Sequence, residues 1–343
     1  TNASHQGYFP GTEDWLDPAY KQDVAADVTA DTTWTNDKWY NLTNVIFVRD
    51  GATLTIEPGT VVRGEPATPG KTCTIGGNTC SVDGDCTQPN ECAIEGTACV
   101  DDGDCTQSGD FCVSDLCQVN TDPGALVVAR GAKLNAAGTF YKPIIFTDDA
   151  DDNVGYSLGK ASGDYGDMSV SLDVEGRWGG VILLGRGYVS NNTDGPPDDG
   201  SAPGPRPIPI RTVQIEGLEV QGLCSNNSSQ RCQTNGDCVS PGVCNVTLGL
   251  YGGCSQQGLP LDECDDDDSG SMQYASIRYG GFNLAPANEI NGLTLGGVGR
   301  ETDFNHIEIF QNQDDGVEFF GGAAQMKNVL IWQVGDDGVD YDE

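Results

Sequence analysis

The stretch Asp314-Asp-Gly-Val-Glu-Phe319 recurs as Asp336-Asp-Gly-Val-Asp-Tyr341, at an offset of 22. The apolar residues of the preceding segment follow the same step, Ile307 with Val329 and Ile309 with Ile331. Apolar and polar residues alternate in both segments, which is typical of β-strands with one buried side. Two short strands in each period predict one coil of a β-solenoid. The alternation predicts six inward-pointing residues: Ile307, Ile309, Val317, Phe319, Val329 and Ile331.

A second repeat lies in the N-terminal part of the chain. Residues Phe47–Leu54 match Val127–Leu134 at an offset of 80, and Leu184–Gly187 is a weaker copy. Each copy has the pattern of a strand followed by a glycine turn, and the two longer copies continue into a second strand. We therefore expect a solenoid over 34–343, preceded by an N-terminal segment or cap at 1–33. Because the sequence stops inside a repeat without a visible cap, we expect either further sequence or a neighbouring subunit to cover the last coil.

Cysteine-rich stretches interrupt this pattern at 72–118 and 222–265. They contain few aliphatic residues, and a related Cys-x₅-Cys pattern starts at Cys80, Cys99 and Cys232. So many cysteines indicate an oxidising compartment, and their spacing is not the paired Cys-x₂-Cys of zinc ribbons. We predict disulfide-stapled insertions, with the pairing left open. The candidates are Cys73, Cys80, Cys86, Cys92, Cys99, Cys105, Cys112, Cys117, Cys224, Cys232, Cys238, Cys244, Cys254 and Cys264.

The composition limits the partners that the chain can have. It has 17 basic and 52 acidic residues among 343, for a formal net charge of −35. Such a surface repels nucleic acid and anionic lipid and attracts cations. The aliphatic runs are far shorter than the roughly 18–20 residues of a membrane span, so we expect none.

Five segments resemble secreted bacterial right-handed parallel β-helix proteins: Leu54–Thr60, Lys142–Thr147, Trp178–Gly185, Glu289–Gly299 and Asp315–Gly322. The resemblance implies an all-β, right-handed parallel β-helix with disulfide-rich insertions, in a secreted or cell-surface protein. It is a poor guide to activity, because the family is largely described as repeat-containing surface protein. The wider superfamily includes pectate lyases and polygalacturonases.

The repeat also stacks carboxylates. It places Asp314 over Asp336, Asp315 over Asp337 and Glu318 over Asp340, about 4.8 Å apart, where like charges repel. Carboxylates without nearby His or Cys favour calcium over zinc or copper. We expect calcium at the four aspartates, with Glu318 and Asp340 less favoured because they alternate with inward residues. Alternatively, the side chains splay into solvent and Asp-Asp-Gly only turns the chain.

The catalytic motifs of the superfamily are missing from the sequence. It has two histidines, His5 and His306, and neither the Gly-His-Gly nor the Arg-x-Lys of polygalacturonases. His306 is expected to be an ordinary surface residue, and no catalytic residue is predicted. The leading hypothesis is a calcium- and disulfide-stabilised structural or adhesive solenoid, which assembles into an extracellular fibre or binds extracellular polysaccharide. The alternative is a calcium-dependent polysaccharide lyase or glycoside hydrolase.

Overall fold

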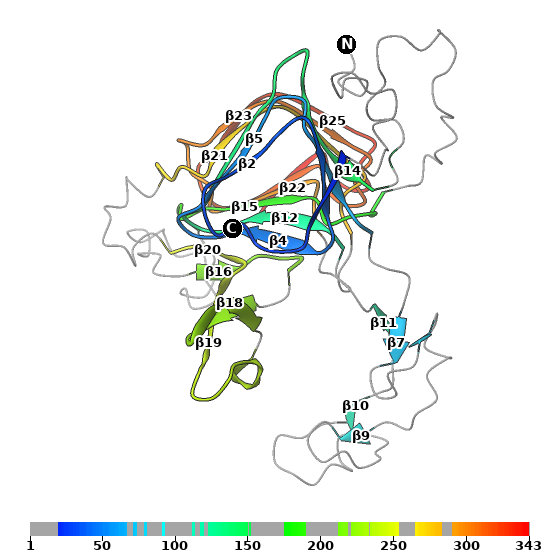
Figure 1. The fold of residues 1–343 in the computed structure, drawn as a ribbon. Coiled ribbons are helices and arrows are strands. Elements are labelled where there is room, and N and C mark those ends of the chain that lie inside the picture. Colours follow the sequence, from blue (N-terminus) through cyan, green and yellow to red (C-terminus); the bar gives the residue numbers. More distant parts are fainter. Residues whose placement is uncertain are drawn as a thin grey trace, which may run out of the picture. The chain divides into compact units, whose positions relative to one another are not determined.

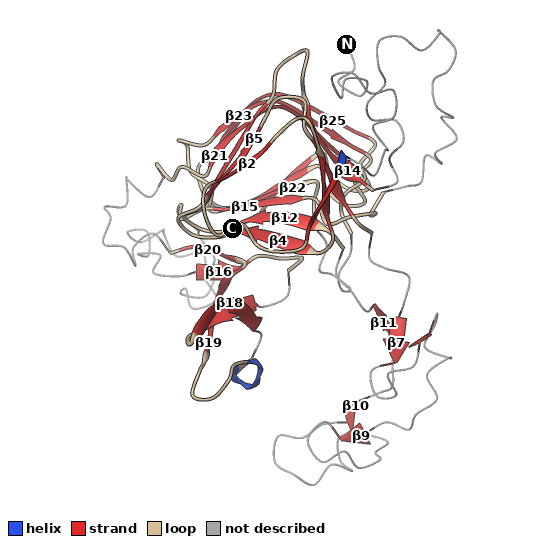
Figure 2. Ribbon diagram, in the orientation of Figure 1, coloured by secondary structure: helices blue, strands red, loops and turns tan. Residues whose placement is uncertain are grey.

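A computed structural model of the chain describes residues 20–66, 71–73, 79–80, 91–92, 112–113, 117–119, 123–149, 151, 175–189, 212–218, 221–232, 234–253, 265–282 and 290–342. The chain divides into two compact units, Thr1–Glu65 with Pro123–Glu343, and Pro66–Asp122. The described residues are mostly strand, with very little helix (Figure 2). The predicted fold class is confirmed: the larger unit is a parallel β-helix.

Three stacks of parallel strands form the sides of this β-helix, which Figure 1 views along the stack. Face 1 consists of β4 (Val45–Val48), β12 (Ala125–Val128), β15 (Val181–Leu184), β22 (Leu293–Gly296), β24 (Val317–Phe320) and β26 (Val339–Asp342).

Faces 2 and 3 share three long strands, β21 (Gly270–Arg278), β23 (Asp303–Phe310) and β25 (Gln325–Trp332). The first halves of these strands extend face 2, with β2 (Thr32–Trp34), β5 (Thr53–Ile56) and β13 (Lys133–Ala137). Their second halves extend face 3, with β1 (Lys21–Val24), β3 (Trp39–Leu42), β6 (Val61–Gly64) and β14 (Ile144–Asp148).

Residues with left-handed backbone conformation bend the long strands at the corner between faces 2 and 3. Tyr274, His306 and Asn328 have φ of 46°, 58° and 56°, and they occupy matching positions of β21, β23 and β25. Positive φ is costly for residues other than Gly, Asn and Asp, and it recurs here because each coil must turn at the same place. The rings of Tyr274 and His306 stack at 4.3 Å on this corner.

Both repeats found in the sequence set the strand register. Phe47 pairs with Val127 and Leu54 with Leu134, at the predicted offset of 80. Ile307 pairs with Val329 and Glu318 with Asp340, at the predicted offset of 22. The shorter offset is therefore the length of one coil where no segment is inserted.

The interior of the β-helix is an apolar column of aliphatic and aromatic side chains. Ile307, Ile309 and Val317 are at most 1 % exposed, and Phe319 and Ile331 are partly buried against the same cluster. Val329 was also predicted to be inward, yet it is 38 % exposed. Its strand, β25, pairs with one neighbour among the described strands, so no described coil covers the other side of Val329.

The outer side of face 1 carries a second apolar core. Phe47, Val127 and Ile182 point away from the interior and are fully buried. Residues of the segment 212–253 complete this cluster, notably Leu248 and Tyr251. This segment pairs β16 (Thr212–Gln214) with β20 (Leu250–Gly252) in antiparallel fashion. The N-terminal strands of face 1, β4, β12 and β15, are thus packed on both sides, as in other buried parallel sheets.

A disulfide module lies within the same segment. Its antiparallel sheet has the order β18 (Asn227–Cys232), β17 (Gln221–Cys224), β19 (Cys244–Leu248), and η5 (Asn235–Asp237) is a short 3₁₀ turn. Disulfides join Cys224 to Cys238 and Cys232 to Cys244. These four of the fourteen candidates are confirmed; the side chains of the other ten lie outside the described residues.

The smaller unit contains short antiparallel strands. β7 (Lys71–Cys73) lies between β11 (Cys117–Val119) and β8 (Thr79–Cys80), and β9 (Glu91–Cys92) pairs with β10 (Cys112–Val113).

The first described coil starts earlier than the sequence analysis placed it. β1 and β2 already pair in parallel with β3 and β5, so the β-helix includes residues from Lys21, ahead of the expected boundary at 34. The polar sequence Lys21-Gln-Asp-Val24 shows no apolar alternation, which is why it was not recognised as a strand. None of the helices in the described part of the chain is long and apolar enough to cross a membrane.

Candidate functional site

One column of residues on the outer side of face 1, one residue from each strand, changes from apolar to polar along the stack. Its N-terminal positions are Phe47, Val127 and Ile182, which lie in the apolar cluster. Its C-terminal positions are Thr294, Glu318 and Asp340, in the same register. Thr294 and Glu318 are nonetheless buried, with 2 % and 7 % of their surface exposed. Polar side chains therefore continue an apolar column without gaining full access to water.

Two overlapping groups of carboxylates meet at this end. The first is Asp314, Asp315 and Asp336, and the second is Asp315, Glu318 and Asp340; in each, one oxygen per residue lies within 4.8 Å of the others. Asp315 belongs to both groups and is 7 % exposed. Five of the six predicted ligands are therefore brought together.

Asp337 is the predicted ligand that joins neither group. Its backbone N–H instead donates a 2.8 Å hydrogen bond to Oδ1 of Asp315. From the sequence alone, Glu318 and Asp340 are expected to be weaker ligands than Asp337, because they alternate with inward residues. The geometry reverses that order: pointing away from the interior is what aims Glu318 at Asp315 and Asp340.

Neutral oxygen atoms surround Glu318 as well. The side-chain amide of Asn291, 1 % exposed, donates a hydrogen bond to Oε2 of Glu318. Oδ1 of Asn291 and Oγ1 of Thr294 are buried and have no hydrogen-bond partner within the described part of the chain. Unpaired buried oxygens are costly and rare, so their position beside a carboxylate group points to a missing partner.

Burial and mutual repulsion raise the pKa values of the two central carboxyls. The pKa of Glu318 rises from 4.5 to about 8, mainly because the side chain is buried. Repulsion from Glu216, Asp315 and Asp340 raises it further. Burial likewise raises the pKa of Asp315 from 3.8 to about 6, against the hydrogen bond from Asp337. At neutral pH, Glu318 therefore either keeps its proton or, if ionised, needs a nearby positive charge to stabilise it.

Three residues near the site were missed from sequence: Asn291, Thr294 and Glu216. Thr294 pairs with Glu318 at an offset of 24 rather than 22, and Asn291 stands at the same offset from Asp315. Glu216 belongs to the segment that covers face 1. Hydrogen bonds from Gly292 and Leu293 to the carbonyls of Asp315 and Gly316 set this longer coil.

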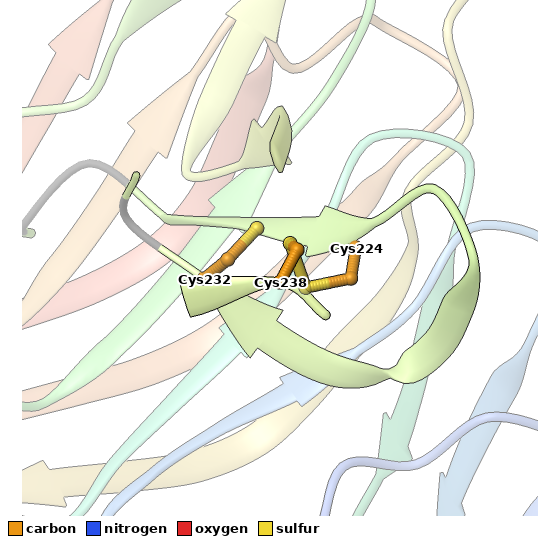
Figure 3. A group of neighbouring side chains, drawn as sticks. All are labelled: Cys224, Cys232 and Cys238. Carbon is orange, nitrogen blue, oxygen red and sulfur yellow. A yellow bond between two sulfur atoms is a disulfide. The ribbon is translucent and has the colours of Figure 1, made fainter. Parts of the chain in front are cut away.

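The cysteine group Cys224, Cys232 and Cys238 also has metal-ligand proximity. Each sulfur atom is consumed by a disulfide, as Figure 3 shows for the bond between Cys224 and Cys238. A thiolate is the species that binds metal, so this group is structural.

A second polar cluster lies on face 3. The guanidinium of Arg278 is 3.8 Å from Oδ2 of Asp151 and 3.9 Å from Oε2 of Glu308. Ser276 and Thr147 donate hydrogen bonds of 2.7 and 2.6 Å to Oε2 of Glu308 and Oδ2 of Asp151, respectively. All five residues are at most 4 % exposed. One guanidinium is shared by two carboxylates, and all three side chains are buried away from any substrate, so this cluster serves packing.

The position of His306 does not suggest a catalytic role. It is exposed at the left-handed corner, in the middle of β23. Its ring stacks on Tyr274. The other histidine, His5, lies outside the described residues.

The candidate site falls inside a recognisable domain. Residues 217–343 match the model of the pectate-lyase-like β-helix domain. This match covers the C-terminal coils, the disulfide module and every carboxylate of the site except Glu216. None of the curated proteins matches the chain. None of the solved structures matches it either.

Proposed function

We propose that the protein is an extracellular structural β-solenoid whose C-terminal coils are held together by a bound calcium ion. The observation that supports this most is the arrangement at Glu318. There, the carboxylates of Asp315, Glu318 and Asp340 lie together. Asn291 and Thr294, which neighbour Glu318, each carry a buried neutral oxygen that has no hydrogen-bond partner within the described residues.

The donor set matches the chemistry of calcium. Calcium takes six to eight oxygen ligands, from carboxylates, amide carbonyls and water. Asp315, Glu318 and Asp340 supply charge, and Asn291 Oδ1 and Thr294 Oγ1 supply neutral oxygens. Loading requires the amide of Asn291 to rotate, exchanging its N–H donor for its oxygen.

A cation here would stabilise the stack of coils. The ligands come from β22, β24 and β26, with Asn291 and Asp315 just before the first two of these strands. An ion bound to them replaces repulsion between consecutive coils by attraction to a shared charge. The two disulfides fit an extracellular setting, where both thiol oxidation and millimolar calcium are available.

Calcium titration of chelator-treated protein tests the proposal. We expect saturable binding by calorimetry and a higher melting temperature with calcium. Asp315→Asn should weaken binding by at least about 10-fold, because one charged contact contributes about 1.5–3 kcal/mol. Asp340→Asn provides a second variant at a less buried position, and Glu301→Gln, an exposed acid outside the site, is the matched control. Equal binding by all three variants would refute the site.

The assembly part of the proposal rests on the last described coil. Val329, Leu330, Val339 and Tyr341 are all more than a third exposed, on strands that pair with one described neighbour each. Exposed apolar strand edges are templates for further pairing. We propose that further coils cover them, from a second copy of the chain in a fibre or from additional sequence. Light scattering over a concentration series distinguishes the two. A particle mass that grows with concentration, and that Leu330→Lys keeps at the monomer value, favours a second copy of the chain. A constant monomer mass favours additional sequence.

The enzymatic alternative is supported by one observation, the raised pKa of Glu318. A carboxyl that stays protonated near neutral pH is what a general acid requires, and Asp315 next to it ionises earlier. Incubation with acidic and neutral polysaccharides, followed by assays for unsaturated and reducing ends, tests it. Product formation that Glu318→Gln abolishes would replace the structural proposal.

A further inference from the structure

A cavity lies between the disulfide module and the turns that follow β4, β12 and β15 of face 1. Its volume is about 570 Å³, and its lining includes Arg49, Asp50, Arg130 and Arg186 from the β-helix. The module contributes Ser228 and Thr247. Volumes of roughly 300–1,000 Å³ are typical of small-molecule sites.

The repeated glycine turn brings the charged residues of this cavity together. Asp50-Gly51 and Arg130-Gly131 follow β4 and β12, and the two glycines have φ of 82° and 80°. Gly51 donates a 3.1 Å hydrogen bond to the carbonyl of Gly131, which stacks the turns. A Cβ on Gly131 would overlap Oδ1 of Asp50 and Nη2 of Arg186, so only glycine leaves room for that ion pair.

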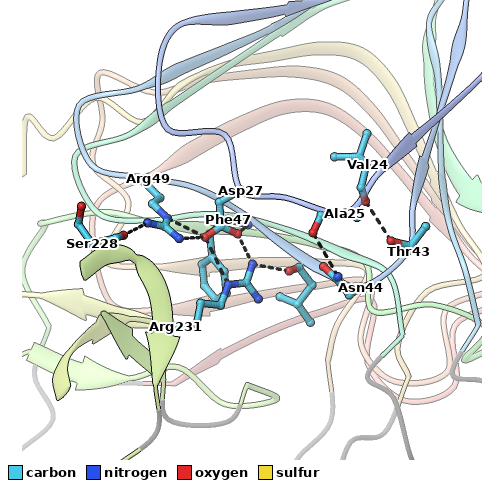
Figure 4. A network of polar contacts seen from close by, with 10 residues as sticks. Val24, Ala25, Asp27, Thr43, Asn44, Phe47, Arg49, Ser228 and Arg231 are labelled. Carbon is cyan, nitrogen blue, oxygen red and sulfur yellow. Dashed lines mark hydrogen bonds and ion pairs between the residues drawn. The ribbon is translucent and has the colours of Figure 1, made fainter. Parts of the chain in front are cut away.

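An arginine of the β-helix and an arginine of the module share one carboxylate. Arg49 and Arg231 both bind Asp27, whose side chain is 2 % exposed, as Figure 4 shows. Arg49 also donates to the carbonyl of Ser228, which ties β4 to the module. Of these two guanidiniums, Arg49 lines the cavity, and its contacts with Asp27 and Ser228 hold it in place.

The other two arginines are less compensated. Arg186 is 3.2 Å from Oδ1 of Asp50, a carboxylate with a 70 % exposed side chain. Arg130 donates a 2.9 Å hydrogen bond to the neutral carbonyl of Gly252, and its buried Nε has no hydrogen-bond partner in the described residues. Burial lowers the pKa of Arg130, and repulsion from Arg186 lowers it further.

This concentration of positive charge is unusual in such an acidic chain. Acidic residues outnumber basic ones by 52 to 17, yet three arginines, Arg49, Arg130 and Arg186, line this cavity with one carboxylate, that of Asp50. A partly buried guanidinium without a matching charge is destabilised unless a ligand supplies that charge.

We propose that this cavity binds the oxyanion group of a small ligand, a carboxylate, phosphate or sulfate, between Arg130 and Arg186. Guanidinium forks match the paired oxygens of such groups. The hydroxyl of Thr247 offers a further donor from the module. Because the β-helix and the module both line the cavity, a bound anion holds them together, independently of calcium.

The test uses the intact protein, freed of calcium, and three probes: inorganic phosphate, sulfate and acetate. Binding is measured by calorimetry at constant ionic strength set with sodium chloride. We expect saturable binding of at least one probe, and the preferred probe identifies the oxyanion class. Arg186→Gln should weaken it by about 10- to 100-fold, since hydrogen bonds to charged groups contribute that much.

Arg300→Gln is the control, because it removes one positive charge from an exposed residue that does not line the cavity. It should bind as the unaltered protein does. Arg130→Gln should also weaken binding, and the far-ultraviolet spectrum of each variant reports whether it folds. Failure of all three probes to bind above chloride would overturn the proposal. Binding that Arg186→Gln leaves unchanged would overturn it too.

Discussion

The backbone N–H of Asp337 donates a 2.8 Å hydrogen bond to Oδ1 of Asp315, the residue 22 positions earlier. This contact joins the same turn of two consecutive coils. It also holds one oxygen of Asp315, the residue that belongs both to the group with Asp314 and Asp336 and to the group with Glu318 and Asp340. The turn-forming role of Asp-Asp-Gly and the cation binding proposed for it are therefore compatible in one structure.

The stability of calcium-free protein should fall as pH rises. The folded-state pKa values of Asp315 and Glu318, about 6 and 8, lie above their ordinary values of 3.8 and 4.5. Their protonated forms favour the folded state, so that contribution is complete below about pH 4 and is lost as the pH passes 6 and then 8. Melting temperatures between pH 5 and 9 in chelator measure it. A curve that stays flat, or rises, across this range would contradict the raised pKa values.

Glu318→Gln should remove most of that pH dependence. The variant keeps the size of the side chain and an acceptor for Asn291 but cannot ionise. At pH 8 without calcium, we expect it to melt above the unaltered protein. With calcium the order should reverse, because the variant loses a charged ligand. Glu301→Gln, measured in parallel, should follow the unaltered protein at each pH.

Two isoleucines in one interior column should differ in their contribution to stability. Ile309 and Ile331 are paired across β23 and β25, but Ile309 is fully buried and Ile331 is partly buried. Ile309→Ala should lower the free energy of unfolding by about 2–5 kcal/mol. Ile331→Ala should cost less than half as much, because its cavity opens to solvent. Urea unfolding of both variants checks this, and equal losses would mean that the last coil is covered.

Gln333→Asn should stabilise the protein slightly. Gln333 is exposed with φ of 54°, in the left-handed region that asparagine tolerates better. Relief of this strain should raise the free energy of unfolding by up to about 1 kcal/mol. Gln325→Asn makes the same change at an exposed position of β25 that is not among the left-handed residues, and it should give no gain.

Removal of one disulfide should loosen the module and leave the interior of the β-helix intact. The Cys232–Cys244 bond closes a sequence separation of 12, which corresponds to about 3 kcal/mol. In Cys232→Ser/Cys244→Ser, amide hydrogen exchange should accelerate in β17–β19. Exchange in β23 and β24 should stay slow. Acceleration throughout the β-helix would show that the module is needed for the whole fold.

Much of the fold followed from the sequence, because a solenoid repeats its own strand positions. The offset of 22 predicted the pairing of Glu318 with Asp340, and the offset of 80 predicted that of Phe47 with Val127. The strand at Lys21 escaped recognition because its side chains are polar and partly exposed. The exposure of Val329 was missed because alternation indicates direction and not whether a neighbouring coil is present.

The candidate sites were predictable only in part. Asp315 and Glu318 belong to the repeat, whereas Thr294 and Glu216 reach the site from a longer coil and from an inserted segment. The cavity arginines Arg49, Arg130 and Arg186 lie far apart along the chain. The weak resemblance of Leu184–Gly187 to Val128–Gly131 was the signal that could have placed Arg186 beside Arg130.

The register of face 1 also bears on the order of folding. Val181 pairs with Leu293 at an offset of 112, whereas Val317 pairs with Val339 at an offset of 22. Closing the longer loop costs about 1.4 kcal/mol more in chain entropy, and long-range pairing is slow. The pairing of Trp39 with Val61 has the same short offset of 22, so the coils at both ends should form first and the contact of β15 with β22 should form late. Pulse-labelling during refolding would then protect β23–β26 and the pair of β3 with β6 before β15, so the end that carries the carboxylates would be one of two places where assembly starts.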